Sequence, residues 1–326
     1  MSIIQNTGKG KLGTLLTLCF LVVLLAGCIK EDLSKCGVVI KFKYDINPSG
    51  QDRFTTDVQK LDLFVFSQQG DLVEEVKVDG PFGADFGIRL QLPAGVYSFI
   101  VGGNLNSKTV LSTSLGSRLV DRRMIYTAPQ NIVADPPEPF YYGAKSTVTV
   151  KPENNGEVLI PMMKVTKRVQ AVFKGVPVTG SNSGQFVCRI EAANGDYTFN
   201  NVPPADARML TYLPERTVNT AAPQITDDFV TLRLFENNAC KSRLILEYIP
   251  PDGSAAVTIL DTPLSDAIKK AYPYGESTDA WQNFFLINDL FILEFEVTHT
   301  FGNFGITPKG WKQNDNHGGG GHGIVG

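Results

Sequence analysis

The feature that most restricts the fold of this chain is an alternation of apolar and polar residues with a period of two. Stretch 38–44 has one wholly apolar set of alternate residues, namely Val38, Ile40, Phe42 and Tyr44. The stretches 61–65, 88–92 and 291–297 repeat this pattern. Successive side chains of a β-strand point to opposite faces, so each stretch is predicted to be a strand with one buried face. The chain is therefore predicted to be mainly β.

The first 27 residues have the composition of a lipoprotein signal peptide. Lys9 and Lys11 form a basic segment, and an apolar run over 12–25 follows it. This run is shorter than the about 20 apolar residues that a transmembrane helix needs. It ends in a Leu-Ala-Gly-Cys tetrad typical of a lipobox, which predicts cleavage after Gly27 and a lipid on Cys28. An ordinary cleaved signal and an uncleaved anchor are the alternatives.

Lipid on Cys28 would hold the mature chain on a membrane. Each buried methylene contributes about 0.8 kcal/mol, so a diacylglyceryl group with a further acyl chain such as palmitate exceeds the marginal binding of one chain. Lys30, Glu31 and Asp32 follow closely and resemble the outward export address of Bacteroidetes surface lipoproteins. Residues 28–37 are therefore predicted to be a lipidated tether at the outer membrane, with the protein exposed on the surface. A solvated charged segment is the alternative.

Turn residues separate many short strand-like stretches, and this favours a tandem of β-sandwiches. Pro93-Ala94-Gly95 is predicted to turn the chain, and Asn194-Gly195 is the strongest hairpin signal. The mature chain of about 300 residues exceeds the length of one sandwich, so two domains are expected. We place the boundary around Pro161, which predicts domains over 38–160 and 161–312.

One or two short helices are expected among the strands. Thr262 is suited to cap a helix and Pro263 to occupy its first position. The apolar residues that follow have helical spacing, namely Leu264, Ala267, Ile268 and Ala271. A second short helix is expected near 111–119.

Net charge and cysteine spacing argue against two classes of protein. Removal of residues 1–27 takes away two lysines and leaves 28 basic and 33 acidic residues, so nothing favours binding to nucleic acid. The cysteines beyond the lipobox, Cys36, Cys188 and Cys240, lack the paired spacing of a zinc site. An exported protein permits a disulfide between Cys188 and Cys240, and two free buried thiols are the alternative.

The chain offers little for catalysis, and no enzymatic activity, metal or non-covalent cofactor is expected. It contains neither a nucleophile elbow nor a metalloprotease or phosphate-loop motif. Its glycine-rich end, 313–326, holds His317 and His322 and matches the spacing of a dinucleotide loop. No strand precedes this segment and no helix follows it, so it is predicted to be a flexible tail. Carboxylates distant in sequence leave a hydrolase as the open alternative.

Short stretches spread over nearly the whole mature chain carry a family resemblance. They are Cys28–Cys36 with Phe42–Asp45, Val58–Phe66 with Gln69-Gly70, Leu92–Tyr97, Tyr141–Gly143, Asn194–Phe199 and Gly310-Trp311. Together they resemble the FimB-like fimbrial anchor lipoproteins of Bacteroidales, within the fimbrillin superfamily. The resemblance implies two tandem transthyretin-like β-sandwich domains. It also implies a structural anchor that holds the stalk pilin of a fimbria at the outer membrane and limits the length of the fimbria.

The resemblance further implies a mode of assembly. In the related stalk pilins an arginine-specific protease removes the first strand, and a C-terminal strand of a neighbouring subunit fills the groove by β-augmentation. A strand joined to lipid cannot be removed without losing the anchor. Our hypothesis is that the first strand is retained, with its inward residues Val38, Ile40, Phe42 and Tyr44, so that this subunit ends the polymer. Arg53 lies where a stalk pilin would be cut, and we interpret it as an ordinary exposed loop arginine.

The C-terminal region is the candidate donor segment for contact with stalk or accessory pilins. Phe301, Phe304 and Ile306 are its apolar residues. Gly302, Gly305 and Pro308 interrupt it, and such residues weaken a strand. The same segment is equally well interpreted as the last core strand of the second domain.

A surface glycan-binding lipoprotein is the alternative function. Stacking faces for sugars would come from Phe140, Tyr141, Tyr142, Trp281 and Trp311. Aromatic residues beside strands more often lie in the core. The two functions therefore differ in whether these rings are exposed together on one face.

Overall fold

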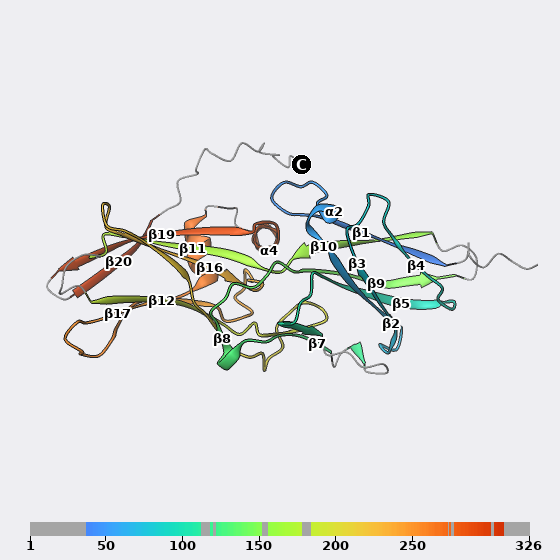
Figure 1. Cartoon of the computed structure of the whole chain (residues 1–326), viewed down its shortest axis with the longest axis horizontal. Helices are drawn as coiled ribbons and strands as arrows, with labels where there is room; N and C mark the ends of the chain where they lie inside the picture. The colour runs from blue at the N-terminus through green and yellow to red at the C-terminus, as the bar shows by residue number, and fades with distance from the viewer. Residues whose placement is uncertain are drawn as a thin grey trace, which may run out of the picture.

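The fold consists of two β-rich halves that follow each other along one long axis (Figure 1). The computed structural model describes residues 37–111, 118–119, 122–151, 156–177, 184–272, 274, 277–300 and 303–309. Strands dominate these residues and the helices are short. The prediction of a mainly β fold of β-sandwich type is thus confirmed.

The N-terminal half is built on one seven-stranded sheet. Its strands are β1 (Val38–Ile46), β2 (Lys60–Ser67), β3 (Leu72–Asp79), β4 (Ile88–Leu90), β5 (Gly95–Gly103), β9 (Tyr141–Val150) and β10 (Glu157–Lys164). Within the sheet they follow the order β3-β2-β5-β9-β10-β1-β4. The β1–β10 pair is parallel and the other pairs are antiparallel.

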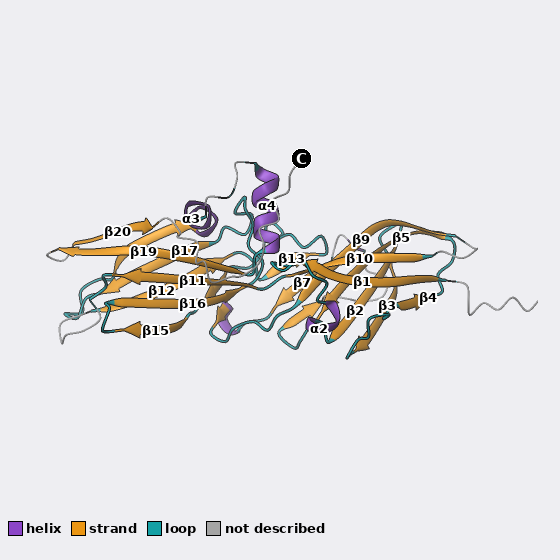
Figure 2. Cartoon of the chain, turned by 90° about the horizontal axis from the view of Figure 1, so that it is seen from above, coloured by secondary structure: helices purple, strands orange, loops and turns teal. Residues whose placement is uncertain are grey.

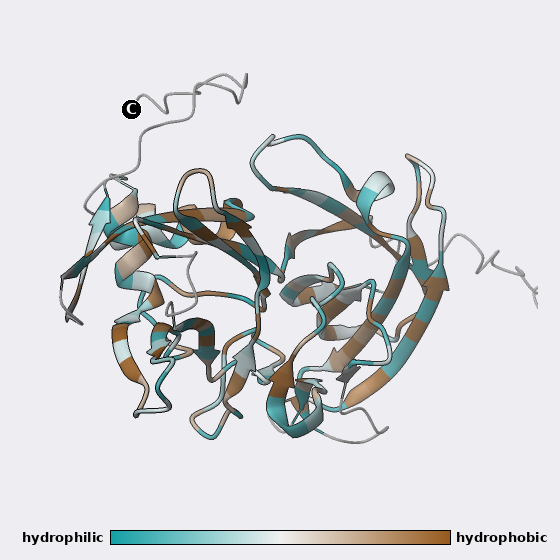
Figure 3. Cartoon of the chain, turned by 60° about the vertical axis from the view of Figure 1, so that its left-hand side comes forward, coloured by the Kyte–Doolittle hydropathy of each residue, from teal (hydrophilic) through white to brown (hydrophobic). Residues whose placement is uncertain are grey.

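This sheet curls over, so that inward side chains from its two ends meet in one core. Ile40 of β1, Leu63 of β2, Phe99 of β5 and Met162 of β10 are all fully buried in the same apolar cluster. The period-two pattern of the sequence produces this arrangement, because alternate residues of each strand point inward. Figure 3 shows the resulting bands of apolar and polar residues along the strands.

The C-terminal half is a sandwich of two five-stranded sheets that share one core. One sheet has the order β15-β16-β11-β19-β20 and the other the order β18-β17-β12-β14-β8. The strands of the first are β11 (Lys167–Lys174), β15 (Glu215–Asn219), β16 (Gln224–Thr231), β19 (Leu290–Thr300) and β20 (Asn303–Lys309). Those of the second are β8 (Ile132–Val133), β12 (Gln185–Ala192), β14 (Leu210–Tyr212), β17 (Arg243–Ile249) and β18 (Val257–Pro263).

The two halves exchange strands with each other. A three-stranded sheet has the order β13-β7-β6, with β6 (Thr109–Leu111) and β7 (Arg123–Tyr126) from the first half and β13 (Asp196–Thr198) from the second. Conversely, β8 of the first half pairs parallel with β14 of the second. The halves are therefore interlocked and not merely joined end to end.

Helices occupy few positions. They are α2 (Phe54–Asp57), the 3-10 helix η3 (Pro129–Asn131), α3 (Leu264–Ala271) and α4 (Thr278–Ile287). The predicted helix after Thr262 is α3, although Pro263 occupies its N-cap position and the first helical residue is Leu264. The sequence interpretation missed α4, whose N-cap is Ser277. The helix expected near 111–119 falls largely outside the described residues.

Strand β10 runs through the predicted domain boundary at Pro161. The β1–β10 ladder continues to Ile46 opposite Met163, so residues 161–164 belong to the first sheet and not to the second. Pro161 is accommodated because the pairing of β10 with β9 begins only at Met162. The predicted boundaries at residues 27, 37 and 312 lie at or beyond the edges of the described residues and stay predictions.

Candidate functional site

The first strand has a partner on each edge. It pairs with β10 from Val39 opposite Glu157 onward, and Val38–Ile40 pair with β4. Its removal would therefore leave a groove between β10 and β4. Backbone hydrogen bonds on both edges make β1 an internal component of the sheet.

One face of β1 fills the core of the N-terminal half. Val38, Ile40, Phe42 and Tyr44 each expose 6% or less of their surface. The Phe42 ring stacks on Phe54 at 5.6 Å between centroids, and Tyr44 meets Tyr141 edge-on at 4.9 Å. Burial raises the pKa of the Tyr44 hydroxyl well above its ordinary value. Full burial stabilises by about 1.5–3 kcal/mol per large apolar side chain, so β1 contributes strongly to this core.

The loop that contains Arg53 packs back onto β1. The Arg53 backbone N–H donates to the Tyr44 carbonyl at 2.9 Å, and its half-exposed guanidinium lies 2.9 Å from the Asp57 carboxylate. The Asp52 carboxylate accepts hydrogen bonds from the backbone N–H groups of Tyr44 and Phe54, each at 3.0 Å. Phe54 follows Arg53 directly, begins α2 and is only 3% exposed. Cleavage after Arg53 therefore requires this segment to unfold locally first.

The last described strand, β20, is an edge strand with little buried surface. It pairs antiparallel with β19, from Glu294 opposite Lys309 to Thr300 opposite Asn303. Ion pairing reinforces the open end of this hairpin, since the Lys309 ammonium lies 2.6 Å from the Glu296 carboxylate. No other strand borders β20 in its sheet, so its second edge is free of backbone partners within the described part of the chain.

Few side chains of β20 reach the core. Phe304 is partly buried, and its ring lies 4.5 Å from Tyr248 and 5.6 Å from Phe186 between centroids. Ile306 is also partly buried, whereas residues 307–309 are exposed. Phe301, the third residue of the candidate donor segment, lies outside the described residues. Strand β1 pairs with a strand on each edge and has one fully buried face, whereas β20 pairs with one strand and its apolar side chains are only partly buried.

The first and last strands lie at opposite ends of the molecule. In Figure 1 the start of β1 lies beside β4 at one end of the long axis, and the β19–β20 hairpin lies at the other end. Figure 2 shows the same separation from above. The two segments that sequence analysis singled out for assembly are therefore brought to the two poles of the molecule and not to one shared site.

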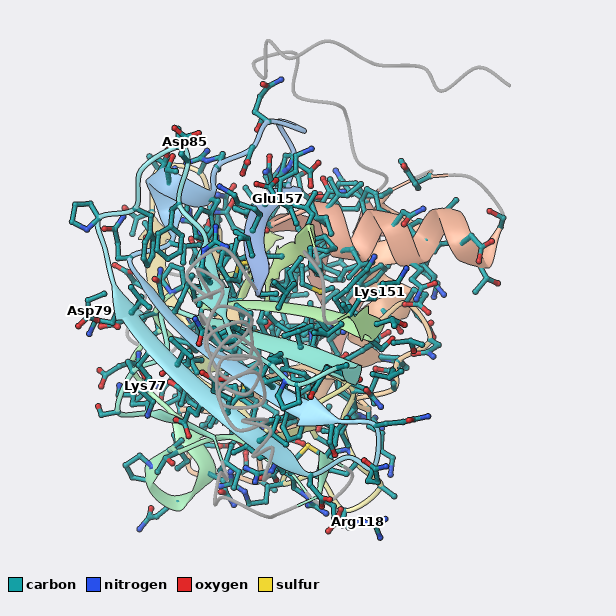
Figure 4. All side chains as sticks on the ribbon, turned by 90° about the vertical axis from the view of Figure 1, so that its right-hand side faces the viewer. Lys77, Asp79, Asp85, Arg118, Lys151 and Glu157 are labelled. Atoms are coloured by element: carbon teal, nitrogen blue, oxygen red, sulfur yellow. The ribbon has the colours of Figure 1, made fainter. Side chains whose placement is uncertain are left out.

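The pole near β1 carries exposed charges of both signs. Figure 4 looks at this end, and the residues that it labels are all exposed: Lys77, Asp79, Asp85, Arg118, Lys151 and Glu157. These six residues comprise three bases and three acids. They do not form a basic cluster of the kind that binds anionic lipid headgroups.

A buried lysine lies at the junction of the two halves, and sequence reasoning missed it. The Lys167 side chain is 1% exposed, and its ammonium donates to the carbonyls of Leu286 and Asn288 at 2.8 Å each. The Asp289 carboxylate lies 3.4 Å from the ammonium. Burial lowers the pKa of Lys167 to about 8 although Asp289 opposes this shift. Lys167 thereby ties the start of β11 to the end of α4.

Aromatic contacts also join the two halves. The Phe199 ring lies 5.8 Å from Phe64 and 5.7 Å from Phe66 between centroids. The Tyr142 hydroxyl donates a hydrogen bond to the Phe199 carbonyl. Burial raises the pKa of Tyr142 to about 12. The junction is therefore a packed interface with a buried polar contact.

The rings suggested for glycan stacking are not gathered on one exposed face. Phe140, Tyr141 and Tyr142 are 1%, 3% and 9% exposed. Trp281 of α4 is partly buried and packs edge-on against Phe284 at 5.4 Å between centroids. Trp311 lies outside the described residues. The structure therefore favours a core role for the rings that it describes.

The largest ion-pair group in a surface hollow is centred on Lys77. A cavity of about 440 Å³ lies over β2 and β3, where the Lys77 ammonium is 3.0 Å from Glu75 and 3.9 Å from Asp62. Burial raises the pKa of the Asp62 carboxyl despite Lys77. Among the described residues, no cluster of three or more His, Cys, Asp or Glu side chains is arranged to hold a metal ion.

The remaining candidate residues divide between buried positions and undescribed segments. Cys188 and Cys240 are buried free thiols with no disulfide between them, and burial raises the pKa of each. The residues predicted for lipidation, cleavage and export, namely Cys28, Gly27, Lys30, Glu31 and Asp32, fall outside the described residues. None of the helices that the structure describes has the length and apolarity to cross a membrane.

Sequence comparison identifies one matching family. Residues 33–317 match the sequence model of the family described as "Mfa2: Fimbrillin-A associated anchor proteins Mfa1 and Mfa2". The match covers both halves of the fold and includes β1 and β20. Comparison with curated protein sequences gives no significant match.

Solved structures share the fold over most of the chain. The fimbrial anchor protein Mfa2 from Porphyromonas gingivalis is 19% identical, with 84% of this chain and 97% of that chain covered and a TM-score of 0.68. A candidate adhesin from Bacteroides ovatus is 19% identical, with 87% and 97% covered and a TM-score of 0.70. A candidate polysaccharide-binding protein from Bacteroides thetaiotaomicron is 23% identical, with 85% and 96% covered and a TM-score of 0.67.

Proposed function

Because this chain belongs to the family of fimbrillin-A associated anchor proteins, we propose that it anchors a fimbria to the outer membrane and limits its length. Membership of the family gives the protein a structural, fimbrial accessory role at the cell envelope. The proposal adds that lipid attaches the protein to the membrane, that β1 is retained while the C-terminal segment contacts the stalk, and that the protein limits the length of the fimbria.

One observation carries the proposal: the first strand is fixed in the core at one pole, and a weakly held edge strand lies at the other. Four inward side chains of β1 are buried, whereas among the side chains described in 304–309 only Phe304 and Ile306 are partly buried. An anchor subunit needs this asymmetry, because one end must stay attached while the other engages a partner. The pole near β1 thus faces the membrane, and the β19–β20 pole faces the fimbria.

Attachment to the membrane is assigned to lipid on Cys28, with Lys30, Glu31 and Asp32 as the export signal. The ten residue-to-residue steps from Cys28 to Val38 span at most about 35 Å when fully extended. The mixed charges at this pole supply no strong attraction to lipid headgroups, so binding strength comes from the acyl chains.

Termination of the polymer follows from retention of β1. A subunit accepts a donor strand only if a groove is open, and β1 occupies the place between β10 and β4. The bond after Arg53 is protected by the hydrogen bonds of its loop and by the buried Phe54. This subunit therefore ends the fimbria at the membrane, and its supply sets the number and length of attached fimbriae.

Contact with the stalk is assigned to the C-terminal segment that contains Phe301, Phe304 and Ile306. Detachment of β20 breaks one antiparallel ladder and exposes part of two apolar side chains. The same side chains, at alternate positions, would then fill core pockets of a stalk or accessory pilin by β-augmentation.

Cells that produce variant proteins test the attachment. Cys28→Ala should release the protein from the outer membrane and shed the fimbriae into the medium, whereas Cys36→Ala should leave both attached. Deletion of the gene should give shed or overlong fimbriae in electron micrographs. Attached fimbriae of normal length in cells that produce only the Cys28→Ala protein would overturn the proposal.

A pair of truncations tests the donor segment. A chain that stops before Asn303 should reach the surface without retaining fimbriae, whereas a chain that stops before Gln313 should behave as wild type. Surface levels of both proteins are measured in parallel, so that loss of protein is distinguished from loss of contact. Retention of fimbriae by the shorter chain would exclude β20 as the donor.

The mass of the protein recovered from fimbriated cells tests retention of β1. We expect a mature N-terminus at Cys28 with its lipid. A mature N-terminus at Phe54 would show that β1 is removed and would refute the termination mechanism.

A further inference from the structure

We propose that the parallel strand pairs β1–β10 and β11–β19 form two shear clamps in series that carry tension along the molecule. This inference rests on the proposed function, because only a subunit held at both poles is pulled along its long axis. It concerns a mechanical property of the fold that the anchor role itself does not specify.

A continuous stretch of backbone connects the two clamps. Strand β10 ends at Lys164 and β11 begins at Lys167, so only Val165 and Thr166 separate them. Both residues are buried, with exposures of 0% and 2%. Figures 1 and 2 show β10 and β11 following each other along the long axis. This stretch is the covalent connection between the two clamps across the junction.

The first clamp is loaded in shear by its geometry. Tension from the tether pulls β1 outward at its N-terminal end, Val38, while β10 is held at its C-terminal end, Lys164, by the rest of the molecule. Because β1 and β10 are parallel, these forces act at opposite ends of the ladder and along the strand axes. All of its hydrogen bonds therefore bear load together.

The second clamp repeats this geometry at the other pole. Tension from the fimbria pulls β19 outward at its C-terminal end, Thr300, while β11 is held at its N-terminal end, Lys167. The two strands are parallel over seven pairs, from Arg168 opposite Leu290 to Lys174 opposite Glu296. The Lys174 ammonium also bridges this pair of strands, at 2.9 Å from the Glu294 carboxylate.

Intact clamps keep most of the protein out of the path of force. The segments 47–156 and 175–289 lie between the strands of each clamp in the sequence, so the path of force from β1 through β10 and β11 to β19 bypasses their backbone until a ladder slips. Each slip would then release on the order of 400 Å of chain, at about 3.5 Å per residue. Two large, discrete extensions are therefore expected and not a gradual lengthening.

Lys167 stabilises the joint between the clamps, which consists of the start of β11 and the residues just before β19. Its ammonium holds the carbonyls of Leu286 and Asn288, which immediately precede β19, and it lies beside Asp289. The Arg168 backbone N–H also donates to the Asp289 carbonyl at 2.8 Å. These contacts keep the starts of β11 and β19 in register, so that the second ladder is loaded evenly.

Single-molecule force measurements on the full-length chain test the proposal. Handles are attached through an azide-bearing amino acid that is introduced at Lys35 and at Thr298, which loads both clamps in shear. In the control, handles at Lys35 and Glu157 pull the same β1–β10 ladder from one end, so that its bonds break one after another. Thr298 and Glu157 are both exposed, which makes the two attachments comparable.

The expected result is a longer lifetime in the shear geometry at the same constant force. The lifetime should exceed that of the control at least about fivefold, the factor for one additional hydrogen bond broken at the barrier. Equal or shorter lifetimes in the Lys35–Thr298 geometry would overturn the proposal. The measurement uses the protein alone, so failure here is distinct from failure of the anchor role, which is read from fimbriae on cells.

A matched pair of variants tests the joint. Lys167→Met should shorten the lifetime in the Lys35–Thr298 geometry and leave the Lys35–Glu157 geometry unchanged, because peeling of β1 does not load the joint. Lys164→Met is the control, since this half-buried ammonium lies 3.5 Å from the same Asp289 carboxylate. Equal losses in both geometries would assign Lys167 to general stability and refute its role in the joint.

Discussion

Replacement of Ile40 by alanine is the most direct test of the first strand as part of the core. Ile40 is 0% exposed and lies in β1 opposite Val158 of β10 and Ile88 of β4. The change removes three buried carbon atoms, which contribute about 0.8 kcal/mol each, and it leaves a cavity. We therefore expect Ile40→Ala to lower the free energy of unfolding by about 3–4 kcal/mol.

Val39→Ala is the matched control, because Val39 is a β-branched neighbour on the outer face of the same strand. It is partly exposed, so its truncation should cost less than about 1 kcal/mol. Urea unfolding of the full-length chain, followed by tryptophan fluorescence and circular dichroism, measures both variants. Hydrogen exchange at the amides of β10 locates the loss in the N-terminal half.

Equal costs for the two variants would contradict the burial of one face of β1. A cost near zero for Ile40→Ala would mean that the N-terminal core is stable without this strand. In that case the groove between β10 and β4 could be emptied at little cost, and the reasoning on polymer termination would fail.

Three further predictions concern the junction and the thiols. The difference in free energy of unfolding between wild type and Lys167→Met should rise by about 2 kcal/mol from pH 7 to pH 9.5. The pKa of Lys167 is about 8 in the folded protein and 10.5 in the unfolded chain, so the folded lysine loses its proton first as the pH rises. Loss of this proton removes the cost of burying the charge. Urea titrations at both pH values measure this rise, and a flat difference would contradict the burial of the charge. Cys188 and Cys240 should resist iodoacetamide at pH 8 in the native protein and react in urea, as peptide masses will show; a disulfide between them would contradict the structure. Tyr142→Phe should lower the free energy of unfolding by about 1–2 kcal/mol by leaving the Phe199 carbonyl without its donor, whereas Tyr97→Phe, which loses a local bond to Pro93, should cost less.

The sequence predicted local structure well where a single element determines the pattern. The alternation in 38–44 predicted the buried face of β1, because the two faces of this strand differ from each other in polarity. The proline and the helical spacing after Thr262 predicted α3. Ser277 and the apolar residues Trp281, Phe284 and Phe285 carried the same kind of signal for α4, and a search for caps and i, i+3, i+4 spacing would have found it.

Features that depend on distant partners were not predictable. Nothing near Lys167 in the sequence indicates that its ammonium is buried, because its acceptors lie about 120 residues away at Leu286 and Asn288. Pro161 suggested a boundary because proline usually ends strands. Its actual position is compatible with β10 only because no β9 partner faces it, which is a property of the sheet and not of the local sequence.

Short motifs resembling fimbrial anchors led to the correct superfamily, which the match over 33–317 bears out. They did not reveal which segments lie at which pole. That distribution depends on the strand order of the sheets, which places β1 and β20 in different halves of the fold.

The exchange of strands between the halves also constrains how the chain acquires its fold. Strand β7 lacks its partner β13 until residues 196–198 have been added to the chain, and β8 has no partner strand until residues 211–212 have been added. Because synthesis proceeds from the N-terminus, the growing chain therefore exposes unpaired edges until more than 200 residues have been made. Pairings over such sequence distances fold slowly and favour aggregation in the meantime. A fragment cut at Pro161 should therefore not fold as an independent unit.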